Sequence, residues 1–249
     1  MTPERLQWTP ELVEQFWSGM SVTGLTQLSF SKQAGRSLVI AVEHLLTRQG
    51  SILDYGAGDG HLIRLLCERG YRAAAYEPSA GRSENLSKAL QEYDGFLGVV
   101  GPSSTIDYDV VVMAEVIEHI LEQELEWTLN RIAALTKLGG LLIMTTPNEE
   151  DLELGMSYCP VSNLLFHRWQ HVRSFTAESL ARLVSDFGFE EIVTHRVEFN
   201  DALYVPSDRQ WGSGDDKVEL PWHLRELKAN RPTTVGAQNS LLYIGVRRD

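Results

Sequence analysis

The sequence predicts an α/β fold built on a doubly wound parallel sheet. Between residues 51 and 146, apolar segments of strand length alternate with segments of helical periodicity, which is the pattern of a parallel sheet covered by helices. The segment 109–114 is apolar on both faces, as expected for a central strand. The segment 51–67 combines a buried strand, a glycine turn and the start of a helix, and therefore predicts a ligand site at the carboxyl edge of the sheet.

The remaining elements follow this unit in order. Further strands are expected over residues 71–77, 96–101, 141–147, 190–199 and 240–247, and helices over residues 11–20, 38–48, 83–93, 121–137 and 174–187. Thr9 is the expected N-cap of the first helix, with Pro10 at its first position. Gly139 and Gly140 are expected to end the helix before the fifth strand. Residues 1–50 form an N-terminal helical segment, residues 51–249 the main domain, and residues 148–175 and 200–238 two insertions with little periodicity.

Composition restricts the class of protein. The 249 residues are 43% hydrophobic, which is ample for a core, and they include no apolar run of membrane-spanning length. The formal net charge of −12 argues against a nucleic-acid partner, which needs a basic surface. Cys67 falls on the apolar side of a helix and is expected as a buried thiol, and the N-terminus shows no secretory signal. A cytoplasmic location is therefore expected.

The glycine turn admits two interpretations. A nicotinamide dinucleotide site requires the spacing G-x-G-x-x-G, whereas Gly56, Gly58 and Gly60 alternate as G-x-G-x-G. Asp54 lies two residues before the first glycine, and Asp59 lies inside the turn. These carboxylates would repel a pyrophosphate but attract a ligand that carries an ammonium or sulfonium charge. A tight turn without a ligand remains the alternative.

A second acid marks the same edge of the sheet. Glu77 ends the second strand, immediately before Pro78. Nucleotide-binding α/β folds place a carboxylate at about this distance beyond the glycine turn, where it accepts hydrogen bonds from the ribose hydroxyls. We therefore expect Glu77 to hold a ribose.

These motifs together resemble the class I S-adenosylmethionine (SAM)-dependent methyltransferases. The resemblance covers residues 51–199 and 240–247, and it includes the 54–60 loop, Glu77, the 109–112 strand, the 115–119 segment and the turn after residue 146. It implies a Rossmann-like seven-stranded sheet with an antiparallel last strand, SAM as cofactor, and an N-terminal lid over the substrate. The implied cofactor-binding residues are Asp54, Gly56, Gly58, Gly60, Glu77, Pro78 and Glu115.

The segment Glu115-Val-Ile-Glu118-His119 supports a more specific hypothesis. Two carboxylates and an imidazole in one turn can bind a divalent cation, such as Mg²⁺, Mn²⁺ or Zn²⁺. The segment resembles that of ubiquinone-pathway O-methyltransferases and of small-RNA 2′-O-methyltransferases, in which it is associated with a metal. His167 or His171 would be the additional ligand. Alternatively His119, His167 or His171 acts as a general base without metal.

The resulting hypothesis is SAM-dependent methylation of a hydroxyl group on a small molecule or saccharide. In residues 166–175, Arg168, Trp169 and Arg173 are suited to an acidic group and a sugar face, although an ordered loop over the sheet edge explains them equally. Two alternatives are a metal-dependent RNA 2′-O-methyltransferase and a non-catalytic SAM-binding protein. Nitrogen rather than oxygen as acceptor atom, and the oligomeric state, stay open.

Overall fold

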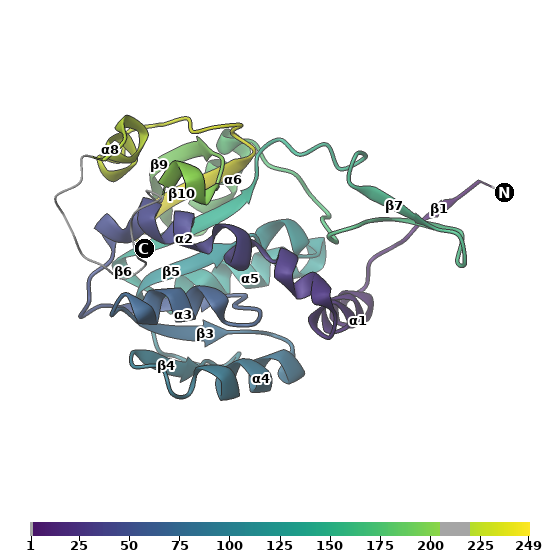
Figure 1. The fold of residues 1–249 in the computed structure, drawn as a ribbon, viewed down its shortest axis with the longest axis horizontal. Helices are drawn as coiled ribbons and strands as arrows, with labels where there is room; N and C mark the ends of the chain where they lie inside the picture. The colour runs from purple at the N-terminus through teal and green to yellow at the C-terminus, as the bar shows by residue number, and fades with distance from the viewer. Residues whose placement is uncertain (1, 205–219) are drawn as a thin grey trace.

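A computed structural model describes residues 2–204 and 220–249, so part of the second predicted insertion lies outside the described residues. In the described part, a seven-stranded sheet has the order β4-β3-β2-β5-β6-β10-β9 (Figure 1). The strand β10 pairs antiparallel with both of its neighbours, which confirms the predicted architecture. The strands are β2 (Ser51–Tyr55), β3 (Arg72–Tyr76), β4 (Phe96–Val99), β5 (Tyr108–Ala114), β6 (Thr136–Pro147), β9 (Phe189–Val197) and β10 (Ser240–Arg247).

Two apolar clusters, one on each face of the sheet, form the core. Leu38 of α2 and Ile63 of α3 belong to the first cluster, and Leu129 of α5 and Leu180 of α6 belong to the second. The free energy gained by burying these side chains fixes the helices against the strands. The helices are α1 (Pro10–Ser21), α2 (Phe30–Val42), α3 (His61–Glu68), α4 (Ala80–Leu90), α5 (Glu122–Leu135), α6 (Ala177–Ser185), α7 (Asp201–Tyr204) and α8 (Trp222–Lys228), with 3₁₀ turns η1 (Gly24–Leu28), η2 (Glu43–Leu45) and η3 (Ile117–His119).

Several local predictions are confirmed. The Thr9 side chain caps α1 by accepting a hydrogen bond from the amide of Leu12 at 3.3 Å. In addition to these predictions, Thr176 and Ser179 form a complete capping box at the start of α6. Cys67 is 7% exposed and carries a free thiol.

The predicted role of Gly139 and Gly140 is wrong. The helix α5 ends at Leu135, and both glycines lie within β6. Gly139 has φ of 75°, and the register between β5 and β6 shifts after Tyr108. The glycines therefore accommodate an irregularity in strand pairing rather than a helix end. The second helix begins earlier in the chain than predicted, because α2 spans Phe30–Val42 and not residues 38–48. Ala34 and Leu38 both lie on its buried face.

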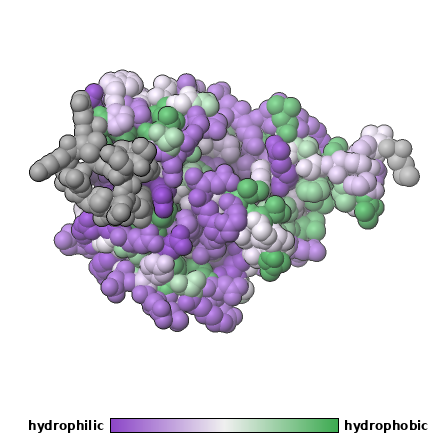
Figure 2. Space-filling view, viewed as in Figure 1, coloured by the Kyte–Doolittle hydropathy of each residue, from purple (hydrophilic) through white to green (hydrophobic). Residues whose placement is uncertain are grey.

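The first predicted insertion forms a hairpin of β7 (Met156–Cys159) and β8 (Leu164–His167). β1 (Glu4–Arg5) pairs parallel with β8, so the N-terminus and the insertion form a small sheet beside the large one (Figure 1). Hydrophobic side chains on the viewed face gather around α1 and this small sheet (Figure 2). Among the described residues, no helix is long and apolar enough to cross a membrane.

Gly60 is fixed by backbone geometry and by packing. It is the N-cap of α3 with φ of 77°. A Cβ at this position would lie 2.7 Å from Leu90 Cδ1 and 3.1 Å from Leu86 Cγ. Its neighbour Gly56 has φ of 86°, and a Cβ there would lie 2.7 Å from Val116 Cγ2. Both glycines therefore allow close packing under the loop.

We expect Gly60→Ala to lower the free energy of unfolding by about 1–3 kcal/mol, because alanine would be strained at this φ and would overlap Leu90. Gly81→Ala is the matched control. It lies exposed in α4, where no described atom lies within 4 Å of an added Cβ, and should be neutral or stabilising by up to about 1 kcal/mol. Urea denaturation checks both values. Equal stability of the two variants would contradict this explanation.

Candidate active site

The predicted site residues follow the ends of parallel strands and therefore meet at one edge of the sheet. The glycine loop follows β2, Glu77 follows β3, Glu115 follows β5 and Asn148 follows β6. β2, β3, β5 and β6 are mutually parallel, so their carboxyl ends share this edge. This is where doubly wound sheets bind their ligands.

Glu77 connects the first two strand ends. Its Oε2 accepts a hydrogen bond from the amide of Gly58 at 2.9 Å, and its Oε1 accepts one from the amide of Ser79 at 3.1 Å. Arg82 Nη2 of α4 lies 3.4 Å from Oε2. Burial raises the pKa of Glu77, although Arg82 and the two amides act in the opposite direction. A buried acceptor therefore lies beside the glycine loop.

Asp54 adds a second buried carboxyl group below the loop. Burial, followed by the charges of Glu77 and Asp59, raises the pKa of Asp54 to about 7. Asp59, in contrast to the buried Asp54, is exposed, and it forms an ion pair with Lys32 of α2. The loop thus combines an excess of carboxylates with buried surroundings, which suits a cationic ligand.

The helix α1 lies over this edge and connects the two halves of the site. Glu14 Oε1 accepts hydrogen bonds from the hydroxyls of Ser79 at 2.8 Å and of Ser18 at 3.0 Å. Trp17 Nε1 donates to Gln170 Oε1 at 2.9 Å, and the Trp17 ring centroid lies 4.9 Å from that of His119. The N-terminal segment therefore reaches both the glycine-loop side and the histidines.

The three predicted histidines come together, and His119 and His171 lie beside Glu118. The ring centroids of His119 and His171 are 4.9 Å apart, and those of His167 and His171 are 4.5 Å apart. Glu118 is 1% exposed, and its Oε2 accepts a hydrogen bond from Thr146 at 3.0 Å. Glu118, His119 and His171 each offer a ligand atom within 4.8 Å of the others.

The ionisation of this cluster departs from ordinary values. Burial raises the pKa of Glu115 to about 7 and, with the charge of Glu115, raises the pKa of Glu118 well above its usual range. Burial and the charge of His171 lower the pKa of His119 to about 3. The surroundings thus favour neutral acids and a neutral imidazole.

The cluster offers the types of ligand that divalent cations use. Glu115 Oε1, Glu118 Oε1 and His119 Nδ1 are buried and form no hydrogen bond with any described residue. Such groups cost free energy when they are left unsatisfied, and either a shared proton between Glu115 and Glu118 or a bound cation would offset that cost. Carboxylate oxygens and imidazole nitrogens are ligands shared by Mg²⁺, Mn²⁺ and Zn²⁺.

Some of the groups that define the site belong to no motif that the sequence predicts. Glu150 lies against His167 and His171, and Gln170 donates to the His119 carbonyl at 3.0 Å. The position of Glu150, three residues after the end of β6 at the same edge, is the signal that could have identified it. Among the implied residues, Pro78 is exposed.

The basic residues of the first insertion are placed differently from one another. Arg173 donates to the carbonyl of Ile120 at 2.7 Å and to Glu122 at 3.1 Å, so it ties the insertion to the start of α5. Arg168 is exposed and Trp169 is partly buried. The contacts of Arg173 therefore favour a structural role in an ordered loop over the sheet edge rather than a role in binding an acidic group.

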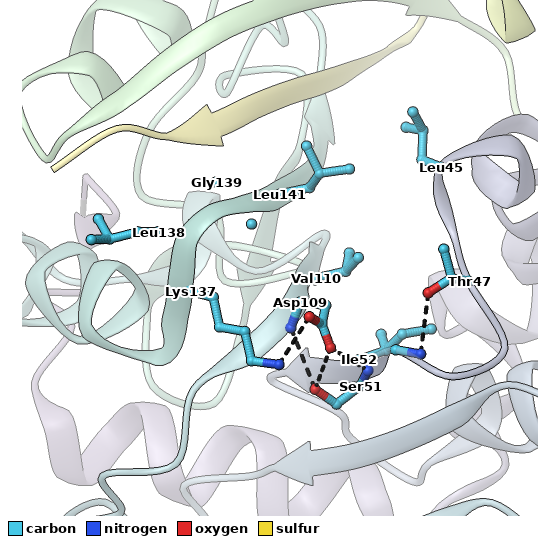
Figure 3. Close-up of a pocket in the computed structure, with 12 residues that line it drawn as sticks. Leu45, Thr47, Ser51, Ile52, Asp109, Val110, Lys137, Leu138, Gly139 and Leu141 are labelled. Carbon is cyan, nitrogen blue, oxygen red and sulfur yellow. Dashed lines mark hydrogen bonds and ion pairs between the residues drawn. The ribbon is translucent and has the colours of Figure 1, made fainter.

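A separate pocket of about 300 Å³ lies at the opposite edge of the sheet (Figure 3). It is lined in part by the start of β2 and by the glycines of β6. There Asp109 Oδ2 accepts hydrogen bonds from the amide of Ser51 at 2.7 Å and from its hydroxyl at 2.9 Å, and Lys137 lies 2.9 Å from Asp109 Oδ1. The polar groups that line this pocket satisfy one another and mainly join β2, β5 and β6.

Comparisons with known proteins agree with this architecture. The model of the family described as "Methyltransferase domain" matches residues 31–195, more than half of the chain, so the chain belongs to this family. Together with the fold, this confirms the prediction of a class I SAM-dependent methyltransferase and of an enzyme. A search of curated proteins finds no match.

Solved structures share the fold at low sequence identity. A chain of the complex between Haloferax volcanii Trm112, a methyltransferase activator, and a methyltransferase has a TM-score of 0.62 and 17% identity, with 94% of this chain and 98% of that chain covered. The Burkholderia thailandensis 1,6-didemethyltoxoflavin-N1-methyltransferase, with bound S-adenosylhomocysteine, has a TM-score of 0.61 and 15% identity over 99% and 94%. A SAM-dependent methyltransferase from Thermotoga maritima has a TM-score of 0.57 and 17% identity over 94% and 100%.

The buried Asp54 predicts a pH dependence of stability. Its pKa is about 7 in the fold and about 3.9 in an unfolded chain, so between these values the folded state binds the proton more tightly. The contribution of Asp54 to the free energy of unfolding therefore declines as the pH rises from about 4 to 7. As the pH rises from 5 to 8, the free energy of unfolding of the Asp54→Asn variant should therefore fall less than that of the parent protein.

Urea denaturation of the protein without cofactor measures this difference, and Asp107→Asn, at an exposed position, is the control. Identical pH dependence in the parent and the Asp54 variant would contradict the assignment of a buried, protonated Asp54.

Proposed function

We propose that this methyltransferase transfers the methyl group of SAM to a hydroxyl group of a small molecule, with a saccharide as the leading class of acceptor. The observation that carries the proposal is the cluster of Glu118, His119 and His171, which lies beside the expected cofactor site at the same edge of the sheet. A hydroxyl group requires removal of its proton, and this cluster offers both an imidazole acceptor and a set of cation ligands.

On the cofactor side, Glu77 accepts hydrogen bonds from the ribose hydroxyls, and Arg82 must yield part of its contact with Glu77 to admit them. The glycine loop receives the methionine portion, with Asp59 as the exposed negative group and Asp54 as a buried carboxyl group whose pKa is raised to about 7. Gly58 is the loop glycine whose added Cβ would meet a flexible side-chain end, Arg82 Nη2 at 3.1 Å. It therefore leaves room for a ligand, whereas Gly56 and Gly60 lie against packed neighbours.

On the acceptor side, the hydroxyl oxygen forms a bond to the methyl carbon as the bond from that carbon to sulfur breaks. The sulfur leaves with the electron pair as a neutral thioether, and the hydroxyl proton passes to a histidine of the cluster. Positioning of the two reactants supplies a large part of the acceleration. A divalent cation, when bound by Glu115, Glu118, His119 and His171, would polarise the hydroxyl and favour its deprotonated form.

The choice of oxygen over nitrogen rests on this cluster. The B. thailandensis relative is an N1-methyltransferase, so the shared fold is compatible with either acceptor atom. We further propose that α1 acts as a lid, since Trp17 lies against His119 and Arg82 Cζ lies 5.7 Å from the centroid of the Trp17 ring. Trp169 and the exposed Arg168 are the groups we propose for a sugar face and an acidic substituent. The cytoplasm stays the predicted compartment.

Binding of S-adenosylhomocysteine tests the cofactor site. We expect Glu77→Ala to weaken binding about 10-fold or more, because the ribose hydroxyls lose a charged acceptor. Gly58→Val should abolish binding, because a branched side chain at φ of 58° enters the cofactor space. Glu84→Gln, an exposed change in α4, is the control and should leave binding unchanged. Isothermal titration calorimetry gives the affinities, and unchanged binding in both site variants would contradict the assignment.

Titration of Mn²⁺, Mg²⁺ and Zn²⁺ into protein saturated with S-adenosylhomocysteine tests the cation. We expect Glu118→Gln to weaken binding at least 10-fold, since it removes a charged ligand but keeps the side-chain shape. Glu126→Gln, at an exposed position of α5, should have no effect. Cofactor binding without cation binding by the parent protein would contradict the metal-assisted form and leave a histidine as the base.

An RNA 2′-hydroxyl is the alternative acceptor, and one observation favours it. His171 lies beside Glu118 and His119, which is the arrangement that the resemblance to RNA 2′-O-methyltransferases implies. The net charge of −12 opposes it. RNA binding that weakens steeply with salt concentration would support this alternative over a saccharide.

A further inference from the structure

Glu150 follows a segment whose backbone is hydrogen-bonded to two other parts of the chain. The amide of Asn148 donates to the Asn239 carbonyl at 2.9 Å, and the amide of Glu149 donates to the Phe175 carbonyl at 2.8 Å. These bonds fix the chain immediately after β6. The carboxylate of Glu150 then lies between two of the three histidines, 2.5 Å from His171 Nδ1 and 3.4 Å from His167 Nε2.

The protonation of His167 follows from its backbone contacts. Its Nδ1 accepts hydrogen bonds from the amide of Trp169 at 3.4 Å and from the amide of His171 at 3.1 Å. Since Nδ1 accepts, the proton of the neutral ring is on Nε2, which faces Glu150 Oε1. The ring is 3% exposed, and Gly155 leaves the space for it, because a Cβ there would overlap the ring. His167 Nε2 therefore faces Glu150 Oε1 at 3.4 Å, although it forms no hydrogen bond with a described residue.

The protonation of His171 follows from Glu150. Glu150 Oε2 lies 2.5 Å from His171 Nδ1, and Oε1 lies 3.4 Å from His167 Nε2. An ionised carboxylate only accepts, so the Nδ1 that lies 2.5 Å from Oε2 carries the proton. The lone pair of the neutral His171 ring is then on Nε2, and His171 is one of the three residues whose ligand atoms cluster with those of Glu118 and His119.

We propose that Glu150 is a positioning residue that holds His171 in the tautomer with the proton on Nδ1, so that Nε2 serves as the acceptor or ligand atom of the active site. His167 Nε2 faces the other oxygen of Glu150 at 3.4 Å. The inference rests on the proposed function, in which His171 acts on the acceptor hydroxyl. Histidines that bind a metal or act as bases are commonly fixed in this way by a carboxylate on the opposite nitrogen.

The tautomer can be observed directly. In protein with ¹⁵N-labelled histidine, saturated with S-adenosylhomocysteine at pH 8, long-range ¹H–¹⁵N spectra distinguish a protonated from an unprotonated ring nitrogen. His171→Asn and His167→Asn provide the assignments. We expect the proton on Nδ1 for His171 and on Nε2 for His167. A His171 ring with its proton on Nε2 would overturn the proposal.

Two substitutions at Glu150 distinguish the effect of its acceptor oxygen on His171 from the effect of its side-chain volume. The Glu150→Gln amide oxygen can still accept from Nδ1, so the His171 tautomer should persist, whereas Glu150→Leu should shift it toward the Nε2-protonated form. Glu153→Leu, at an exposed position in the same insertion, is the control. An unchanged tautomer in the Leu variant would also overturn the proposal.

Affinity for Mn²⁺ is the second readout. We expect Glu150→Leu to weaken Mn²⁺ binding about 10–100-fold and Glu150→Gln to weaken it less, as for other carboxylates that orient a metal-binding histidine. If the parent protein binds no Mn²⁺, the metal-assisted form of the proposed function fails, while the tautomer spectra still decide the role of Glu150. Equal Mn²⁺ affinity in the parent and the Leu variant would overturn the positioning role toward a cation.

Discussion

The hydrogen bond between the amide of Gly58 and the carboxylate of Glu77 is the interaction on which the site depends. It joins the turn after β2 to the end of β3, so two neighbouring strand ends are fixed by one buried acid. Burial of this acid is costly, and the amides of Gly58 and Ser79, with Arg82, offset the cost. The lower part of the loop is closed by packing, since Gly56 lies against Val116 and Gly60 against Leu90. This division of roles explains three glycines within five residues.

The N-terminal segment connects the two halves of the molecule's functional edge. Glu14 of α1 reaches Ser79, two residues beyond Glu77, and Trp17 reaches His119 and Gln170. Farther out, the Trp8 ring centroid lies 5.5 Å from that of Phe16 and 6.5 Å from that of Phe166 of β8. A helix whose contacts span both groups can respond to ligands at either one, because a ligand shifts an equilibrium through its differential contacts.

The acids and histidines form an electrostatic unit rather than separate reactive groups. Glu115 and Glu118 favour their protonated forms and His119 its neutral form, so the inner part of the cluster holds little charge without a ligand. Glu150 is the exception, because its hydrogen bond with His171 lowers its pKa. The unit thus has a charged outer carboxylate and an inner set of donors whose ionised forms a cation would stabilise.

The sequence by itself determined the architecture and the individual strand ends. The alternation of apolar strands and periodic helices, the spacing of Gly56 and Gly60 before Glu77, and the apolar character of β5 are local patterns, and each reports a burial requirement that any chain with this fold must meet. Contacts between distant segments could not be obtained in this way. Gly139 was assigned to a helix end because its role depends on how β5 pairs with β6. Likewise, Glu150 meets His171 and Trp17 meets His119 only through the folded insertion and the N-terminal helix. Side chains separated by 21 and 102 positions carry no shared periodicity, so only tertiary packing could decide that they form one site.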